Sequence, residues 1–354
     1  MSSRPRQIRR VAELAARGLV PPERMPALQR VAARYAVALT PELADLIDPT
    51  DPADPVARQF VPDARELVVA PEERDDPIGD ERFSPLKGIV HRYPDRVLLK
   101  PHHACPVYCR FCFRREQVGP GGKALTPREL GAALDYIRTR PEIWEVIVTG
   151  GDPFLMSPRR LAALVRALDA IEHLGVIRFH TRVPVVDPAR VDARLAAALR
   201  AEKAVYVAIH ANHPREITAG MRVACARLSK AGIPLLSQTV LLRGVNDDAE
   251  ILERLFRGLV AARVKPYYLH HPDLAPGTAR FRLGLEEGQG LLRQLRGRIS
   301  GLCQPTYVLD LPGGAGKVPI GPSYVSPGDR PGTSMIEDYR GRRHSYAALA
   351  SSDS

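Results

Sequence analysis

Residues 104–115, Ala104-Cys-Pro-Val-Tyr-Cys-Arg-Phe-Cys-Phe-Arg-Arg115, place three cysteines in one short stretch. These are Cys105, Cys109 and Cys112, with the spacing C-x3-C-x2-C. Thiolates hold iron–sulfur clusters, and a cubane cluster normally takes four of them. Three in one loop leave one iron without a protein ligand, free to bind a small molecule. Structural zinc, the main alternative, usually draws on two pairs of ligands, and the sequence offers no second pair. We therefore expect a [4Fe–4S] cluster here.

After this loop, short apolar runs alternate with segments of helical spacing. The apolar runs are 97–99, 145–149, 176–181, 205–210, 234–240 and 264–270. The helical segments are 127–139, 158–171, 190–200, 219–231, 248–262 and 286–299. Such alternation predicts βαβ units, a parallel sheet and an α/β fold. Active-site residues are then expected at the C-terminal ends of the strands.

The cysteine motif, with an aromatic residue just before the last cysteine, resembles that of the radical S-adenosylmethionine (SAM) enzymes. The resemblance implies a partial (β/α)6 barrel, which about six βα units would fill. It also implies that the open iron chelates SAM and delivers the electron that splits it.

The stretch Thr149-Gly-Gly-Asp-Pro153 follows an apolar strand directly. Gly150 and Gly151 allow a ligand to approach the backbone closely, and the carboxylate of Asp152 can meet an ammonium. In radical SAM enzymes a Gly-Gly-acid segment at this place contacts the amino group of SAM. His210 and Gln238 also lie at strand ends, so we expect them at the same end of the barrel. There they would be SAM contacts or ordinary polar residues of the barrel rim.

A glycine-rich run near the C-terminus, Leu309-Asp-Leu-Pro-Gly-Gly-Ala-Gly-Lys317-Val-Pro-Ile, ends in a lysine. A Walker phosphate loop needs Ser or Thr after the lysine and a helix beyond it, whereas Val318 and Pro319 follow here. A lysine on such a loop also suits a Schiff base with pyridoxal 5′-phosphate (PLP). The residues alone leave PLP and a mobile surface turn both open.

A longer series of motifs resembles lysine 2,3-aminomutase over roughly residues 40–335. Besides the three stretches above, the series consists of His91–Leu99, Thr181–Val186, Asn212–Thr218, Gln238–Asp247 and Lys265–Leu269. The resemblance implies that Lys317 holds PLP and is catalytic, and that Arg114 grips the substrate carboxylate. It implies that Asp273 and Asp310 bind the distal ammonium of lysine. At the phosphate of PLP it places Arg92 and Arg96.

The resemblance also implies a reaction and a division of the chain. The enzyme would be an isomerase that converts L-lysine to β-lysine by moving the amino group from C2 to C3. We expect an N-terminal helical region and wrapping connector over 1–90, the core barrel over 91–302, and a PLP and substrate segment over 303–335. The stretch Arg330–Ser354 is polar, and we expect it to be loosely ordered, with a polar C-terminal tail over 336–354.

One departure from the family concerns zinc. Clostridial-type members carry a cysteine-rich C-terminal zinc site, completed by a cysteine where this chain has Asp248, and no cysteine follows Cys303 here. We therefore expect no zinc and a different or weaker subunit contact. This short form is similar to relatives that make β-lysine for modification of elongation factor P.

Three other functions remain open. One is a 2,3-aminomutase for another amino acid, although Asp273 and Asp310 would repel a negative side chain. Another is a radical SAM enzyme that modifies a protein or RNA. The third is a non-catalytic iron–sulfur module, which leaves the Lys317 loop unexplained.

Composition bounds the partners. The 354 residues carry a net charge of +11, but the arginines are scattered and aromatic residues make up only 6%. We therefore expect no nucleic-acid partner. No signal peptide and no stretch of about 18 apolar residues occurs, so we expect a soluble, cytoplasmic protein. Cys225 and Cys303 are single and fit buried core thiols. The expected partners are L-lysine and an external electron donor such as flavodoxin or ferredoxin, and a homo-oligomer remains open.

Overall fold

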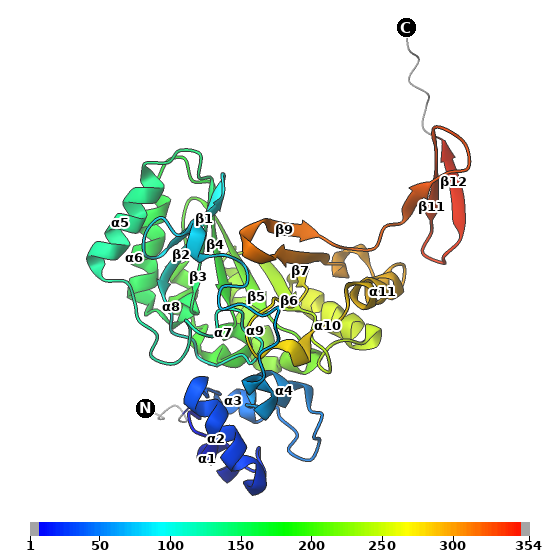
Figure 1. Cartoon of the computed structure of the whole chain (residues 1–354). Helices are drawn as coiled ribbons and strands as arrows, with labels where there is room; N and C mark the ends of the chain where they lie inside the picture. Colours follow the sequence, from blue (N-terminus) through cyan, green and yellow to red (C-terminus); the bar gives the residue numbers. More distant parts are fainter. Residues whose placement is uncertain (1–6, 348–354) are drawn as a thin grey trace.

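A nine-stranded sheet forms the centre of the computed structural model, which describes residues 7–347 (Figure 1). The strands lie in chain order, and β2 to β8 pair in parallel. They are β2 (Arg96–His102), β3 (Glu145–Gly150), β4 (Val176–Thr181), β5 (Ala204–His210), β6 (Leu235–Val240), β7 (Val264–His270) and β8 (Thr306–Leu311). Antiparallel edge strands flank them, β1 (Ile89–Tyr93) beside β2 and β9 (Gly316–Pro319) beside β8. The expected α/β barrel-like sheet is confirmed.

The two edges of this sheet approach each other. The backbone N–H of Lys317 on β9 donates a hydrogen bond to the hydroxyl of Tyr93 on β1, at 2.6 Å. A Cβ added to Gly316 would lie 3.2 Å from the same hydroxyl, so glycine lets the strands come close. The sheet therefore curves into a nearly closed barrel whose seam lies beside Lys317.

Helices follow the parallel strands and cover the outside of the sheet. They are α5 (Pro127–Arg138), α6 (Pro158–Asp169), α8 (Ala193–Ala198), α9 (Ala219–Lys230), α10 (Ala249–Ala261) and α11 (Leu285–Leu295). Capping side chains explain where several begin, since Thr126, Ser157 and Thr218 each accept a backbone N–H of the first turn. Helix α8 begins later than the expected 190–200 segment because the side chain of Asp192 accepts the backbone N–H of Leu195 and caps it. No helix of residues 7–347 is long and apolar enough to cross a membrane.

The inner and outer faces of the central strands are buried, as parallel strands under helices require. Val148, Phe179 and Val207 are fully buried, and they join residues of α6, α9 and α10 in one hydrophobic core. Leu252, Leu255, Phe256 and Leu259 show why α10 packs, because this spacing puts all four on one buried face.

The N-terminal region packs beneath the barrel (Figure 1). It consists of α1 (Val11–Ala16), α2 (Met25–Arg34), α3 (Pro41–Ala44) and α4 (Pro55–Phe60), and the short α7 (Val183–Val186) lies near it. Backbone bonds tie this region to the cysteine loop: Tyr108 N–H donates to Ala38, and Arg110 N–H donates to Gln59. The remaining short elements are 3-10 turns: η1 (Pro22–Arg24), η2 (Ala64–Leu67), η3 (Glu81–Phe83), η4 (Pro153–Leu155), η5 (Pro188–Arg190), η6 (Pro214–Glu216), η7 (Ala279–Phe281), η8 (Gly301–Cys303) and η9 (Pro312–Gly314).

The C-terminal region differs from the expected loosely ordered tail. Strands β10 (Val325–Pro327), β11 (Thr333–Glu337) and β12 (Arg343–Ala347) form a separate antiparallel sheet that projects from the body (Figure 1). The expectation of loose order is therefore wrong as far as Ala347, and the expected 335/336 boundary falls inside β11. Backbone pairing and an ion pair between Arg293 and Glu337 hold this sheet. These strands carry few apolar residues, so periodicity gave no signal. Residues 348–354 lie outside the described residues.

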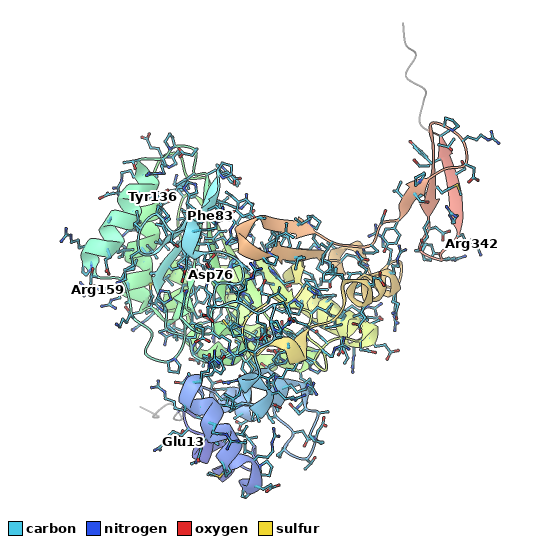
Figure 2. All side chains as sticks on the ribbon, viewed as in Figure 1. Glu13, Asp76, Phe83, Tyr136, Arg159 and Arg342 are labelled. Carbon is cyan, nitrogen blue, oxygen red and sulfur yellow. The ribbon has the colours of Figure 1, made fainter. Side chains whose placement is uncertain are left out.

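Surface charge is spread over the molecule. Arg159 on α6 and Arg342 near the tip of the projecting sheet lie far apart on outer surfaces (Figure 2).

Cys225 and Cys303 are free and buried, as expected.

Candidate active site

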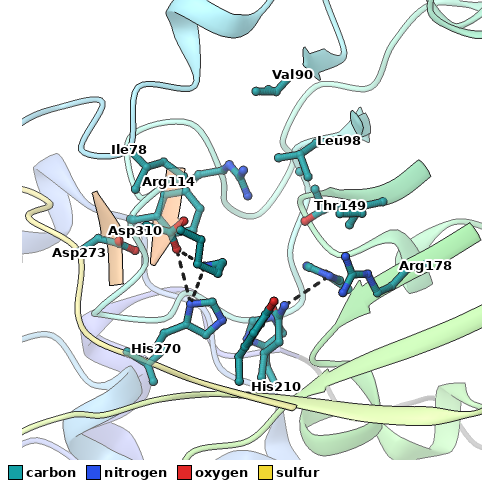
Figure 3. Close-up of a pocket in the computed structure, with 18 of the residues that line it drawn as sticks. Ile78, Val90, Leu98, Arg114, Thr149, Arg178, His210, His270, Asp273 and Asp310 are labelled. Atoms are coloured by element: carbon teal, nitrogen blue, oxygen red, sulfur yellow. Dashed lines mark hydrogen bonds and ion pairs between the residues drawn. The ribbon is translucent and has the colours of Figure 1, made fainter. Parts of the chain in front are cut away.

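One cavity of about 750 Å³ opens inside the barrel. It is lined by the cysteine loop, by the ends of β3 to β7, and by the β8–β9 hairpin with Lys317. Figure 3 shows Asp273, Asp310 and His270 grouped on one side of it, with Arg114 above and Arg178 across from them. Every residue predicted for the site lines this cavity: Arg92, Arg96, Cys105, Cys109, Cys112, Arg114, Gly150, Gly151, Asp152, His210, Gln238, Asp273, Asp310 and Lys317.

Buried acid–base pairs fix the cysteine loop. Arg110 donates through Nε to both carboxylate oxygens of Glu66, at 2.9 and 3.0 Å, and Arg115 pairs with the same carboxylate. All three side chains are fully buried. Arg110 directly follows Cys109 and Arg115 lies three residues after Cys112, so these pairs tie the loop to Glu66. Glu66 was not predicted, because it lies in a polar connector where no motif distinguishes it from other acids.

The three thiols fit an iron–sulfur cluster. All three are half-buried, form no disulfide and line one cavity, and burial raises the pKa of each thiol. Iron supplies the positive charge that stabilises thiolates at such a place. Within residues 7–347 no three His, Cys, Asp or Glu side chains converge closely enough to hold one metal ion. Arg182 adds a further positive group, since its Nη1 donates to the Sγ of Cys109 at 3.2 Å.

Arg182 is held rigidly. Its Nη2 donates to Gln59 at 2.7 Å and to Glu216 at 2.5 Å, and only 7% of its surface is exposed. The guanidinium lies over the ring of Phe60 at 4.5 Å and near that of Phe111 at 5.4 Å. Sequence reasoning missed this residue, although it directly follows the end of β4.

The Gly150–Asp152 turn packs against the cysteine loop. Gly150 has φ +106°, and a Cβ on Gly151 would overlap the backbone of residues 103 and 104. The carboxylate of Asp152 is turned into the protein. It accepts from the hydroxyl of Thr181 at 2.6 Å and from three backbone N–H groups, those of residues 154, 182 and 183. Through these four bonds the side chain ties β3 to β4, and Asp152 still lines the cavity.

Neutral histidines cover the inner wall. Burial, with Arg182 next, lowers the pKa of His210 to about 3, and burial likewise holds the pKa of His180 well below its usual range. Gln238 Nε2 lies 3.4 Å from His180 Nε2. His180 and His270 were not predicted, although both stand at strand ends, which is the signal that selected His210.

Lys317 and Asp310 are direct cross-strand neighbours in the β8–β9 hairpin. Lys317 Nζ donates to Asp310 Oδ2 and lies 3.3 Å from Nδ1 of His270. Burial alone would raise the pKa of Asp310, but His270 and Lys317 hold it well below its usual range. Because opposite positions on an antiparallel pair bring side chains together, the hairpin explains why residues seven apart form one group.

Asp273 completes this corner, and within residues 7–347 its carboxylate forms no ion pair, although Lys317 and Arg114 act on it electrostatically. Its Oδ1 is buried without a hydrogen-bond partner among the described residues. Burial, with the charge of Asp310 next, raises the pKa of Asp273 to about 7. A buried carboxylate that lacks a partner costs free energy, and a bound ammonium would remove that cost.

The three predicted arginines each pair with a nearby acid. Arg92 and Arg114 both pair with Asp80, at 3.0 and 2.8 Å, and their side chains are 11% exposed. Arg96 is more open; it pairs with Asp95 and lies 3.8 Å over the ring of Tyr93. Asp80 was not predicted, because nothing in a connector rich in Asp and Pro distinguishes it.

The barrel, the three-cysteine loop and the strand-end cavity define a radical SAM protein, and a family model described as "Radical SAM superfamily" matches residues 99–255. A second family model, "Lysine-2,3-aminomutase", matches residues 292–347. The chain is 41% identical to the L-lysine 2,3-aminomutase of Acetoanaerobium sticklandii over 304 residues, which are 86% of this chain and 73% of that protein. It is 42% identical to that of Clostridium subterminale over 289 residues, 82% of this chain and 70% of that one.

The glutamate 2,3-aminomutase of Clostridioides difficile is 36% identical over 298 residues, 84% of this chain and 70% of that protein. This chain belongs to the lysine 2,3-aminomutase family, as its motifs predicted. The family consists of isomerases that use a [4Fe–4S] cluster, SAM and PLP.

Proposed function

We propose that this protein converts L-lysine to β-lysine. The observation that carries the proposal is the acidic corner of Asp273 and Asp310 beside Lys317. Two carboxylates in one buried corner favour a substrate that carries an ammonium at its far end. A substrate of the opposite charge, such as glutamate, would meet repulsion from both.

The residues would divide the work as follows. Cys105, Cys109 and Cys112 would hold the cluster, and Lys317 would hold PLP. When bound, the cluster and SAM supply the radical that takes a hydrogen atom, and PLP supplies the carbon that holds the amino group as it moves. Arg114 would bind the substrate carboxylate, whereas Arg92 and Arg96 would bind the phosphate.

The protein would fix the substrate at both ends, which sets the position of C3. Asp273 and Asp310 would hold the distal ammonium, and Arg114 the carboxylate. Because His180 and His210 are neutral, they carry no positive charge that would compete with Arg114 for the substrate carboxylate.

Anaerobically reconstituted protein with SAM, PLP and a one-electron reductant should turn L-lysine into β-lysine, as measured by chromatography. L-Glutamate under the same conditions should remain unchanged, and D310N should lose most of its activity on lysine. Turnover of glutamate at the rate of lysine would overturn the proposed substrate.

Partners and place in the cell are part of the same proposal. An acidic electron carrier such as flavodoxin or ferredoxin would supply the electron, which the net charge of +11 favours. The cytoplasm would suit the protein, because it is a reducing compartment and the cluster is oxygen-sensitive. The β-lysine would serve modification of elongation factor P, osmolyte synthesis or lysine breakdown. Comparing the amount of free β-lysine in cells with and without elongation factor P distinguishes the first use from the other two. Sedimentation of the reconstituted protein would show whether it assembles.

A further inference from the structure

Residues 76–83, here called the strap, cross over residues 312–316. These glycine-rich residues lead to Lys317 and are called the glycine loop. Figure 2 labels Asp76 and Phe83 at the two ends of this segment. Gly79 has φ +68°, and a Cβ there would lie 2.7 Å from the backbone of Gly313. Arg82 Nη1 also donates to the carbonyl of Gly313 at 3.0 Å. The strap therefore lies in direct backbone contact with the loop.

Asp80 is the buried acid of the strap and is 3% exposed. Its Oδ1 accepts from Nη2 of Arg92 at 3.0 Å. Its Oδ2 accepts from Nε and Nη2 of Arg114, at 3.0 and 2.8 Å. One carboxylate thus holds two arginines that both line the cavity.

Each of the two guanidinium groups has an N–H donor that Asp80 does not use. Asp80 takes the Nε and Nη2 edge of Arg114, and no described residue accepts from Nη1. Nε of Arg92 is buried and has no hydrogen-bond partner in the described part of the chain. A planar guanidinium held along one edge presents the other edge in a fixed direction, which suits carboxylate and phosphate oxygens.

Asp80 is ionised in this setting. Burial alone would raise its pKa, but Arg114, Lys100 and Arg92 hold the pKa below the usual range. Its charge neutralises part of the positive charge that the arginines bring together. Removal of that charge would leave Arg92 and Arg114 free to move apart.

We propose that Asp80 is a positioning residue that aims Arg114 at the substrate carboxylate and Arg92 at the phosphate of PLP. This inference rests on the proposed function, because it takes the ligands of both arginines from there. A single carboxylate then sets the geometry of cofactor and substrate binding together. A strap that served only to support the fold would not distinguish between ligands with and without these anionic groups.

The test compares ligand pairs that differ by one anionic group. L-Lysine and 1,5-diaminopentane share both amines, but only lysine has a carboxylate. PLP and pyridoxal differ only in the phosphate. Equilibrium dialysis of reconstituted protein without SAM measures lysine and diaminopentane on the PLP-loaded form, and PLP and pyridoxal on the PLP-free form.

Asp80→Asn should weaken L-lysine about tenfold or more and diaminopentane less than about threefold, as expected for a charged hydrogen bond lost at one group. It should likewise weaken PLP more than pyridoxal. Asp76→Asn is the matched control. Asp76 accepts the backbone N–H groups of Asp80 and Glu81, at 2.8 and 2.9 Å, so its loss disturbs the strap without touching either arginine.

Equal weakening of both ligands in each pair would overturn the inference, and so would a stronger preference in Asp76→Asn, which acts on Asp80 only through the backbone, than in Asp80→Asn. If Asp80→Asn does not fold, Asp80→Glu must show the same preference in smaller measure, because it keeps the charge and shifts it by one methylene. If wild-type protein does not prefer lysine to glutamate, the proposed function fails, and the PLP and pyridoxal pair still decides the role of Asp80.

Discussion

Lysine affinity should depend on pH through Asp273. In the free protein the pKa of this carboxyl is raised to about 7, first by burial and then by Asp310. The ammonium of lysine binds the ionised form. Protons therefore compete with lysine below pH 7, and affinity rises as the pH rises through this value. From pH 6 to pH 8 the ionised fraction grows about tenfold, which corresponds to about 1.4 kcal/mol of binding free energy.

Equilibrium dialysis of the PLP-loaded protein without SAM measures how the dissociation constant of lysine changes with pH. Other groups titrate over the same range, including those of lysine and PLP, so the comparison that matters is with D273N. The wild-type dissociation constant should fall about tenfold more than that of D273N between pH 6 and pH 8. L-Norleucine, which has the same chain length without the distal ammonium, should show no such difference. Equal slopes for wild type and D273N would refute the assignment.

Four further outcomes are expected. Replacing the three loop cysteines by alanine should abolish iron and sulfide binding; retained iron would contradict the cluster. Borohydride treatment of PLP-loaded protein should fix the pyridoxyl group to Lys317, and peptide mapping to Lys265 or Lys230 would contradict this. R182M should lower the cluster potential, because a positive donor to Cys109 is lost, so that the reduced fraction at a fixed potential falls about tenfold; an unchanged titration would contradict it. E66Q should lower the free energy of unfolding by about 3–5 kcal/mol in denaturant melts, whereas E287Q at an exposed pair should change it little.

The barrel could be predicted because its signals are local. The β3 and β5 apolar runs match the predicted strands within a residue, and α9 and α10 match the predicted helices equally closely. Strand-end position then brought His210, Gln238 and the glycine turn to one cavity. The projecting sheet was missed since β12 is exposed throughout and its pairing depends on the backbone alone.

Long-range pairs account for what the sequence could not give. Asp80 lies 34 residues from Arg114, and Glu66 lies 44 residues from Arg110. Neither acid stands in a periodic segment or a motif, so nothing local separates them from solvent-exposed acids nearby. Asp152 shows the converse. Its motif was recognised, but only the fold reveals that its carboxylate faces Thr181 and the backbone.

These acids share a physical role. Glu66 holds Arg110 and Arg115 beside the cysteines, and Asp80 holds the arginines beside the glycine loop. Each lies in the connector, which is the segment between α4 and β1. Of this segment, Ile78 lines the cavity. Removal of the partners of a buried carboxylate is strongly destabilising, so the position of the connector depends on the arginines of the cysteine loop and of the cavity. The connector therefore links the two parts of the site, because its two buried acids hold the arginines of the cysteine loop and those of the cavity.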